Sequence, residues 1–225
     1  DLAVQATADS VRLQFDGGRD EQHITLAGTA HQLSSVPKFA LEGRLTNFAP
    51  SAWMEQAPFE GVLNGTLALE GSGNEPENAD VEFRLDLEES LIQDRPVGSL
   101  QAHAKLAQQN IVGQLNGQST FGDFKVDFRC DSLLTKEGFR IDAEVAALNL
   151  NPVLQNDSLS TDINLQLEAE GSGFQPETMQ ADLSLKITDS KFLDLFVRDI
   201  TLEAQMIDQV VDVDTCLLYT SDAAD

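Results

Sequence analysis

Apolar and polar side chains alternate along most of this chain. Residues 81–87 read Val-Glu-Phe-Arg-Leu-Asp-Leu, which places four apolar side chains on one face of an extended strand and three charged ones on the other. Residues 163–169 and 183–187 alternate in a similar way. A period of two residues is typical of strands with one buried face. We therefore predict an all-β fold with about six strands in every hundred residues.

Glycine- and proline-containing segments interrupt the alternation and are expected to form the connections. Asp16-Gly17-Gly18 and Asn116-Gly117 are typical turn sequences. Pro50 and Pro152 are each expected to open a short helical turn, because the fixed φ of proline suits the first helical position. Sustained 3.6-residue periodicity is missing, so no longer helix is predicted.

The sequence repeats itself at an interval of one hundred residues. Residues 70–77, Glu-Gly-Ser-Gly-Asn-Glu-Pro-Glu, match residues 170–177, Glu-Gly-Ser-Gly-Phe-Gln-Pro-Glu. Matches of apolar character continue on both sides of this segment. The predicted organisation is a first repeat at 1–100, a second at 101–200, the start of a third at 201–215, and a non-native tail at 216–225.

Two architectures can accommodate a sheet that has one apolar face. Each repeat could close into its own sandwich, or all strands could join one curved antiparallel sheet whose apolar face lines an open trough. The inward positions carry aliphatic residues and phenylalanine, with no inward tryptophan to anchor a sandwich core. No linker separates the repeats, because an alternating stretch runs across residue 100. The open trough is therefore favoured.

The residues expected to line this trough follow directly from the alternation. They are Leu63, Leu67, Leu69, Phe83, Leu85, Leu87, Phe124, Val126, Phe128, Phe139 and Ile141, with Ile163, Leu165, Leu167, Leu183, Leu185 and Ile187 in the second repeat.

Composition narrows the possible partners. The 38 acidic and 14 basic residues give a formal net charge of −24, which argues against nucleic acid because phosphate binding needs a basic surface. A hydrophobic content of 41% is enough for an ordered fold. No apolar run reaches the roughly 18 residues of a membrane span, and no targeting signal is visible, so the sequence is interpreted as an internal piece of a longer protein.

Candidate catalytic and metal-binding groups are sparse. His23, His31 and His103 fall on polar positions without recurring partners and are interpreted as exposed surface residues. Cys130 matches Ala30 in the first repeat and is interpreted as a small apolar residue. The Gly71-Ser72-Gly73 segment is followed by a strand and flanked by glutamates, which favours a turn over a phosphate loop. We expect no enzyme activity, no cofactor and no metal site.

The pattern resembles the AsmA-like/TamB group of Gram-negative envelope proteins. The resemblance is carried by the amphipathic strands, by the Gly-Ser-Gly loops with a downstream proline, and by Ser90 followed by residues 95–102, Arg-Pro-Val-Gly-Ser-Leu-Gln-Ala. The Asn-Phe-Ala-Pro and Asn-Leu-Asn-Pro turns at 47–50 and 149–152 fit it as well. It covers about residues 1–215.

The resemblance implies a function in the cell envelope. Proteins of this group have an inner-membrane anchor and a long periplasmic β-structure with an apolar interior, and they are implicated in moving phospholipid between the two membranes. For this chain it implies a periplasmic location, phospholipid acyl chains as partners, an anchor outside the present sequence, and an outer-membrane barrel assembly protein as a further partner. Two alternatives remain open: a TamB-type outer-membrane protein translocation and assembly factor, or an acidic array of β-sandwiches used for surface adhesion.

Overall fold

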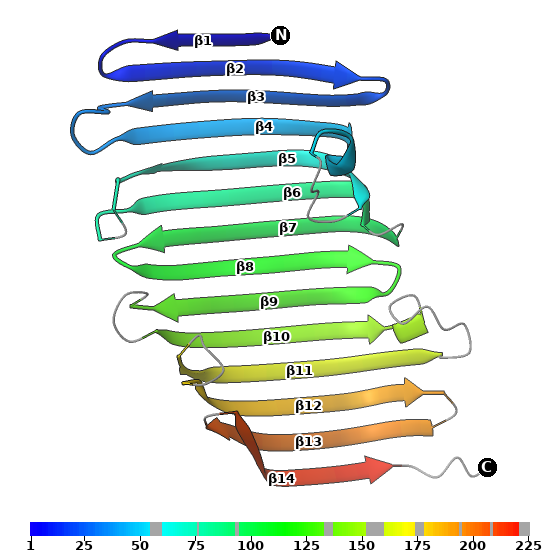
Figure 1. The fold of residues 1–225 in the computed structure, drawn as a ribbon. Coiled ribbons are helices and arrows are strands. Elements are labelled where there is room, and N and C mark those ends of the chain that lie inside the picture. Colours follow the sequence, from blue (N-terminus) through cyan, green and yellow to red (C-terminus); the bar gives the residue numbers. More distant parts are fainter. Residues whose placement is uncertain are drawn as a thin grey trace. The chain divides into compact units, whose positions relative to one another are not determined.

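A computed structural model describes residues 1–54, 60–75, 77–92, 95–132, 137–151, 160–173, 178–193, 195–207 and 209–220. Strands make up nearly all of the regular structure in these residues. Fourteen of them follow one another in sequence order in one antiparallel sheet (Figure 1). They are β1 (Leu2–Ala6), β2 (Ser10–Arg19), β3 (Gln22–His31), β4 (Lys38–Phe48), β5 (Gly61–Ser72), β6 (Asp80–Ile92), β7 (Arg95–Ala107), β8 (Asn110–Ser119), β9 (Gly122–Asp131), β10 (Gly138–Leu148), β11 (Thr161–Ser172), β12 (Gln180–Phe192), β13 (Leu195–Ile207) and β14 (Val210–Thr220).

The predicted all-β class and antiparallel pairing are confirmed. The sheet does not close on itself, because β1 and β14 occupy its two ends in the strand order. The chain divides into two compact units, Asp1–Gly113 and Gln114–Asp225, and the division falls inside β8. We call them unit 1 and unit 2 and describe each by itself.

Strand bounds recur at an interval of one hundred residues. β4 begins at Lys38 and β10 at Gly138, while β7 ends at Ala107 and β13 at Ile207. One interval therefore contains six strands, as the alternation predicted. β14 extends to Thr220 and pairs with β13 over its last residues, whereas residues 221–225 lie outside the described part. The non-native origin of residues 216–225 stays a prediction.

Two glycine segments that were expected to form turns lie inside strands instead. Gly17 is within β2 and Gly117 is within β8, and the chain reverses after these strands end. Aromatic rings occupy the space that a side chain would take at both positions. A Cβ atom on Gly17 would lie 2.6 Å from the Phe15 ring, and one on Gly117 would lie 2.3 Å from the Phe124 ring. The turn prediction was wrong because both glycines make room for an aromatic ring beside an extended strand and do not reverse the chain.

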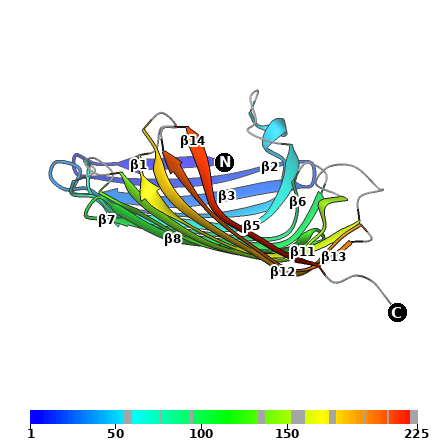
Figure 2. The same cartoon turned by 90° about the horizontal axis from the view of Figure 1, so that it is seen from below.

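The helical turn expected at Pro50 is confirmed. It forms η1 (Pro50–Ala52), a single 3-10 turn with proline at its start. In unit 1, Figure 2 shows η1 standing above the sheet and shows β5 and β6 bending along their length toward it. The other expected turn, at Pro152, lies outside the described residues.

A buried serine holds an irregularity in the strand pairing of each unit. In unit 1 the register shifts between Leu45 and Phe48 in β4 and between Val62 and Gly65 in β5. The backbone N–H of Asn64 donates to Ser90 Oγ at 3.0 Å, and the Asn64 amide oxygen accepts from the Asn47 N–H at 2.7 Å. Together these bonds link β4, β5 and β6 across the shift.

Unit 2 repeats this arrangement with one substitution. The Asn164 N–H donates to Ser190 Oγ at 2.9 Å, and the Asn164 amide oxygen accepts from the Ala147 N–H at 3.0 Å. Asn47 and Ala147 both adopt positive φ, at 47° and 53°. We call each set an Asn–Ser clasp. Because both clasps sit at register shifts, they fix where the strands change their pairing.

Candidate functional site

Strand register gathers the predicted lining residues on one face of unit 1. Leu67 in β5 lies opposite Leu85 in β6, and the next row pairs Leu69 with Phe83. Directly opposed residues of antiparallel strands project from the same side of the sheet. We call this side the apolar face. It carries Leu63, Leu67, Leu69, Phe83, Leu85 and Leu87.

Unit 2 has an apolar face of the same composition. Val126 lies opposite Ala143, and Leu167 lies opposite Leu185. The remaining predicted residues all fall on this face: Phe124, Val126, Phe128, Phe139, Ile141, Ile163, Leu165, Leu167, Leu183, Leu185 and Ile187. Their placement is thus a structural fact, and their contact with lipid stays a prediction.

Among the described residues, no second layer covers the apolar face of either unit. Among the predicted lining residues, Leu87 is buried at 4% exposure and the others are half-buried. In a sandwich, an opposing sheet would remove such inward side chains from water altogether. The alternative of one closed sandwich per repeat is therefore wrong for the part of the chain that the structure describes.

The size of the apolar face makes it unusual for a surface. In unit 1, seven strands spaced about 4.8 Å apart extend roughly 29 Å, and four rows of side chains along a strand such as β3 extend roughly 20 Å. The resulting area of roughly 600 Å² matches the upper end of the largest apolar patches on soluble monomers, and such patches often mark interaction sites.

One end of the apolar face in unit 1 carries an aromatic cluster. The Trp53 ring, placed by η1, lies edge-on to Phe15 with ring centroids 6.5 Å apart, and it lies 6.1 Å from Phe48. Both phenylalanines belong to the apolar face, because Phe15 lies opposite Leu26 and Phe48 lies opposite Leu63. The expectation that no tryptophan points inward was wrong, because Trp53 follows a strand and lies outside the alternating pattern.

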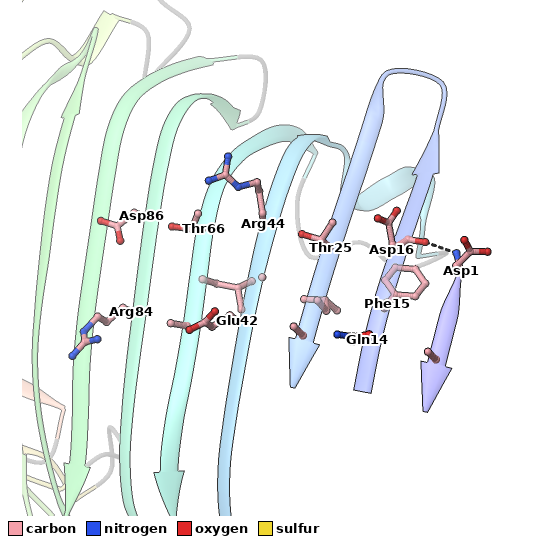
Figure 3. A pocket seen from close by; sticks show the side chains of 16 residues that line it. Asp1, Gln14, Phe15, Asp16, Thr25, Glu42, Arg44, Thr66, Arg84 and Asp86 are labelled. Atoms are coloured by element: carbon pink, nitrogen blue, oxygen red, sulfur yellow. Dashed lines mark hydrogen bonds between the residues drawn. The ribbon is translucent and has the colours of Figure 1, made fainter. Parts of the chain in front are cut away.

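The opposite, polar face of unit 1 is hollowed. A hollow of about 700 Å³ is lined mainly by two rows of polar-face residues from β1–β6 (Figure 3). One row places Arg44 between Thr25 and Thr66, and long side chains alternate with short ones across the strands. The sequence predicted a concavity only on the apolar side. The short threonine and alanine side chains between arginine and glutamate explain the additional hollow.

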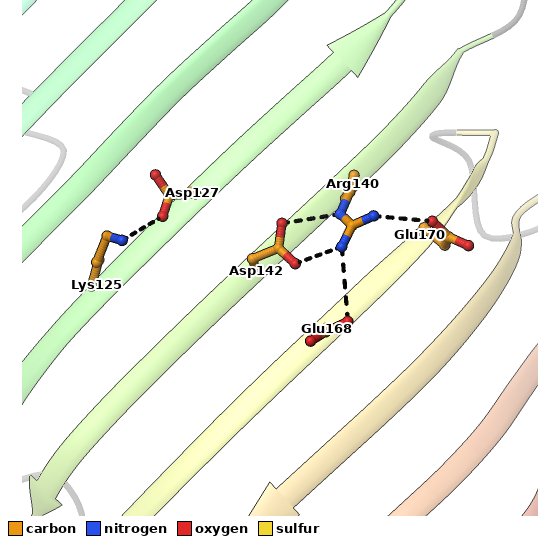
Figure 4. Close-up of polar contacts among 6 residues, drawn as sticks. All are labelled: Lys125, Asp127, Arg140, Asp142, Glu168 and Glu170. Atoms are coloured by element: carbon orange, nitrogen blue, oxygen red, sulfur yellow. Dashed lines mark hydrogen bonds and ion pairs between the residues drawn. The ribbon is translucent and has the colours of Figure 1, made fainter.

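Ion pairs run across the polar face of unit 2 (Figure 4). Arg140 contacts Asp142 at 3.1 Å, Glu170 at 3.7 Å and Glu168 at 3.8 Å. The hydrogen bond to Asp142 is the main cause that raises the pKa of Arg140. These exposed contacts organise the charged face but provide no site for chemistry.

A similar pair forms between neighbouring positions of β9. Lys125 contacts Asp127 at 3.0 Å. This hydrogen bond raises the pKa of Lys125 and lowers the pKa of Asp127. Both side chains therefore stay charged over the whole neutral range.

The remaining reactive side chains do not assemble into a catalytic site in the described residues. All three histidines lie on the polar face, where His103 Nε2 lies 2.9 Å from Glu82 Oε1. The hydrogen bond from His103 is the main cause that lowers the pKa of Glu82, and Arg84 adds to it. Burial raises the pKa of the Cys130 thiol, which lies opposite Phe139 on the apolar face.

The described residues also show no metal site and no membrane-spanning helix. The described residues contain no group of three or more histidine, cysteine or acidic side chains that could hold a metal ion. In the same part of the chain, no helix is long and apolar enough to cross a membrane. Comparison with protein-family models, with curated proteins and with solved structures gave no match.

Proposed function

We propose that this chain is a periplasmic segment of an envelope-biogenesis protein, and that its apolar faces conduct phospholipid between the inner and outer membranes. The observation that carries the proposal is the uncovered apolar face, which recurs in both units with half-buried leucine, isoleucine, valine and phenylalanine side chains. The resemblance to the AsmA-like/TamB group supports it. On this reading an inner-membrane anchor and an outer-membrane barrel assembly protein are the expected partners.

The physical chemistry of such a face suits a conduit. Acyl chains gain about 0.8 kcal/mol for each methylene group removed from water, without directional contacts. A lipid held only by such contacts can move along the face, because neighbouring positions are nearly equivalent in energy. The rows of similar aliphatic side chains provide this equivalence, whereas a fixed binding pocket needs a few precisely placed polar groups.

The acidic polar face fits the same function. Outward carboxylates keep a sheet with one uncovered apolar face soluble, and they discourage association between sheets. Anionic headgroups are repelled from this face by its charge. The phospholipid is therefore directed to the apolar side.

Lipid co-purification tests the proposal. The chain is expressed in the periplasm of a Gram-negative host and isolated without detergent, and bound lipid is identified by mass spectrometry. We expect phospholipid in the wild-type sample and much less in Leu85→Asp, which places a carboxylate in the centre of the apolar face. Ala68→Asp is the matched control, because it introduces the same side chain on the polar face, directly opposite Arg84 in the register. Absence of lipid from the wild-type protein would overturn the proposal.

A further inference from the structure

The aromatic cluster at the end of the apolar face in unit 1 is held from several sides. The Gln22 amide oxygen accepts from the indole N–H of Trp53 at 3.0 Å and from the Ala49 N–H at 3.4 Å. Arg19 Nη1 donates to the Ala52 carbonyl at 3.4 Å. Residues at the β2–β3 connection therefore fix η1 in place over the end of the face.

Gly17 makes room for the cluster on the strand beneath it. A Cβ atom at Gly17 would lie 2.6 Å from the Phe15 ring and 3.3 Å from the Trp53 ring. The absence of a side chain lets both rings lie close to the backbone of β2. The rings therefore close off the end of the face instead of extending its flat surface.

The indole N–H of Trp53 already has a hydrogen-bond acceptor. Because its N–H donates to Gln22, the indole offers no hydrogen bond to a lipid headgroup. What it can present is the apolar part of the ring, since Trp53 as a residue is 37% exposed. Tryptophan at a membrane surface commonly uses its N–H at headgroup level, and this ring is not free to do so.

We propose that the Phe15–Phe48–Trp53 cluster is a stop for the methyl end of an acyl chain bound along the strands of unit 1. This inference rests on the proposed lipid function and adds the orientation of the bound lipid. A headgroup must stay hydrated, so it cannot enter the end covered by η1, whereas a bare hydrocarbon end can contact the rings.

The dimensions of the face agree with this orientation. The residues from Ile24 to Ala30 in β3 extend about 20 Å. One acyl chain in a bilayer leaflet occupies about 15 Å, half of the hydrocarbon thickness. A chain that ends at the cluster therefore covers about three quarters of the apolar rows and points its headgroup toward the opposite ends of the strands.

The only tryptophan of the chain is a built-in reporter for this geometry. Phospholipids brominated near the carboxyl end, the middle or the methyl end of the acyl chain are bound to the protein, and quenching of Trp53 fluorescence is measured for each. Bromine quenches on contact. We expect quenching to be several-fold stronger from the methyl end than from the carboxyl end.

The outcomes separate this inference from the proposed function. Equal quenching from all positions, or strongest quenching near the carboxyl end, overturns the stop while lipid binding stands. Lipid that co-purifies without any quenching also overturns it. If no lipid binds at all, the proposed function fails, and the stop fails with it.

Variants of the cluster provide a second readout. Gln22→Ala keeps the reporter but releases the indole, so the difference between methyl-end and carboxyl-end quenching should shrink. Trp53→Ala should shift the co-purified lipids toward longer acyl chains by mass spectrometry. Met54→Ala is the matched control, since Met54 is an exposed neighbour outside the cluster. An unchanged chain-length distribution in Trp53→Ala overturns the stop.

Discussion

In a sheet with so little covered surface, the most deeply buried of the described side chains is a serine. Ser90 is 1% exposed and Ser190 is 3% exposed, whereas the leucines around them are mostly half-buried. Each hydroxyl accepts one backbone N–H and lies within bonding distance of two carbonyl groups on its own and the adjacent strand. Single polar groups thus hold the places where the strand pairing is irregular.

Removing the hydroxyl of Ser90 should therefore lower the free energy of unfolding by more than the small size of this group suggests. In Ser90→Ala the Asn64 N–H loses its partner in a partly buried position, and we expect the free energy of unfolding to fall by about 1–3 kcal/mol. Ser190→Ala should show a similar loss, because its clasp has the same bonds. Urea unfolding measures both. Ser184→Ala, at an exposed site, is the control, and an equally small effect in all three variants would contradict the role of the clasp.

Acid should weaken the contacts of Glu82. The pKa of Glu82 is lowered from an ordinary value of 4.5, chiefly by the hydrogen bond from His103. The contribution of Glu82 to the stability of the fold is therefore complete above pH 4.5 and is lost as the pH falls through the lowered pKa. Thermal melting at decreasing pH should show a smaller acid-induced drop in Glu82→Gln than in the wild type.

A neighbouring carboxylate provides the control for this titration. Glu70 lies directly opposite Glu82 in the register of β5 and β6. Glu70→Gln removes the same charge without touching the His103 contact, so it should keep the acid-induced drop. Identical pH profiles for the two variants would show that the His103 contact contributes nothing.

At the scale of the strands, one pair of hydrogen bonds shows which backbone groups of β1 face away from the sheet. The Asp16 N–H donates to the Asp1 carbonyl at 2.9 Å. The Asp1 amino group donates to the Asp16 carbonyl (Figure 3). Bonded and non-bonded positions alternate along an antiparallel pair. The backbone groups of Ala3 therefore point toward β2, and those of Val4 point to the side on which no described strand lies.

Proline substitutions should distinguish the two sides of β1. Ala3→Pro removes a donor from the β1–β2 ladder, whereas Val4→Pro removes one that faces away from β2. We expect Ala3→Pro to be less stable than Val4→Pro by about 1–3 kcal/mol. Thermal melting compares them. Equal destabilisation would mean that the outer edge of β1 is bonded as well.

At the scale of the whole molecule, the important property is that each unit is one layer thick in the described residues. A charge on the apolar face can then reach water by a change of rotamer, whereas a charge inside a closed core cannot. The same openness leaves the apolar rows accessible to a ligand. Stability and binding should therefore respond differently to a mutation on this face.

Leu85→Asp tests this separation. Because Leu85 is half-buried, we expect a loss of about 1–3 kcal/mol, below the losses of more than about 4 kcal/mol that are typical of an uncompensated charge in a closed core. Guanidinium unfolding gives the value, with Ala68→Asp on the polar face as the control. Complete unfolding of Leu85→Asp alone would indicate that another layer covers the face.

The alternation of apolar and polar residues predicted the strands and predicted that the apolar side chains lie on one face of the sheet, because the backbone of a strand imposes a period of two residues. It did not predict the clasps. Ser90 matches Ser190 in sequence, yet a lone serine in an alternating strand looks like an ordinary outward residue until the register shift beside Asn64 is known. Trp53 was misplaced for a related reason, since η1 has no periodicity that assigns it to a face.

The sixfold count of strands in each hundred residues has a consequence for how such a protein can change in length. Six is an even number, so duplication or deletion of one interval leaves every later strand running in its original direction, with the same side chains turned to the same side. Loss of a single strand would instead reverse everything downstream. Growth in whole intervals is thus the step that evolution, or an engineer, can take without redesigning any other part of the chain.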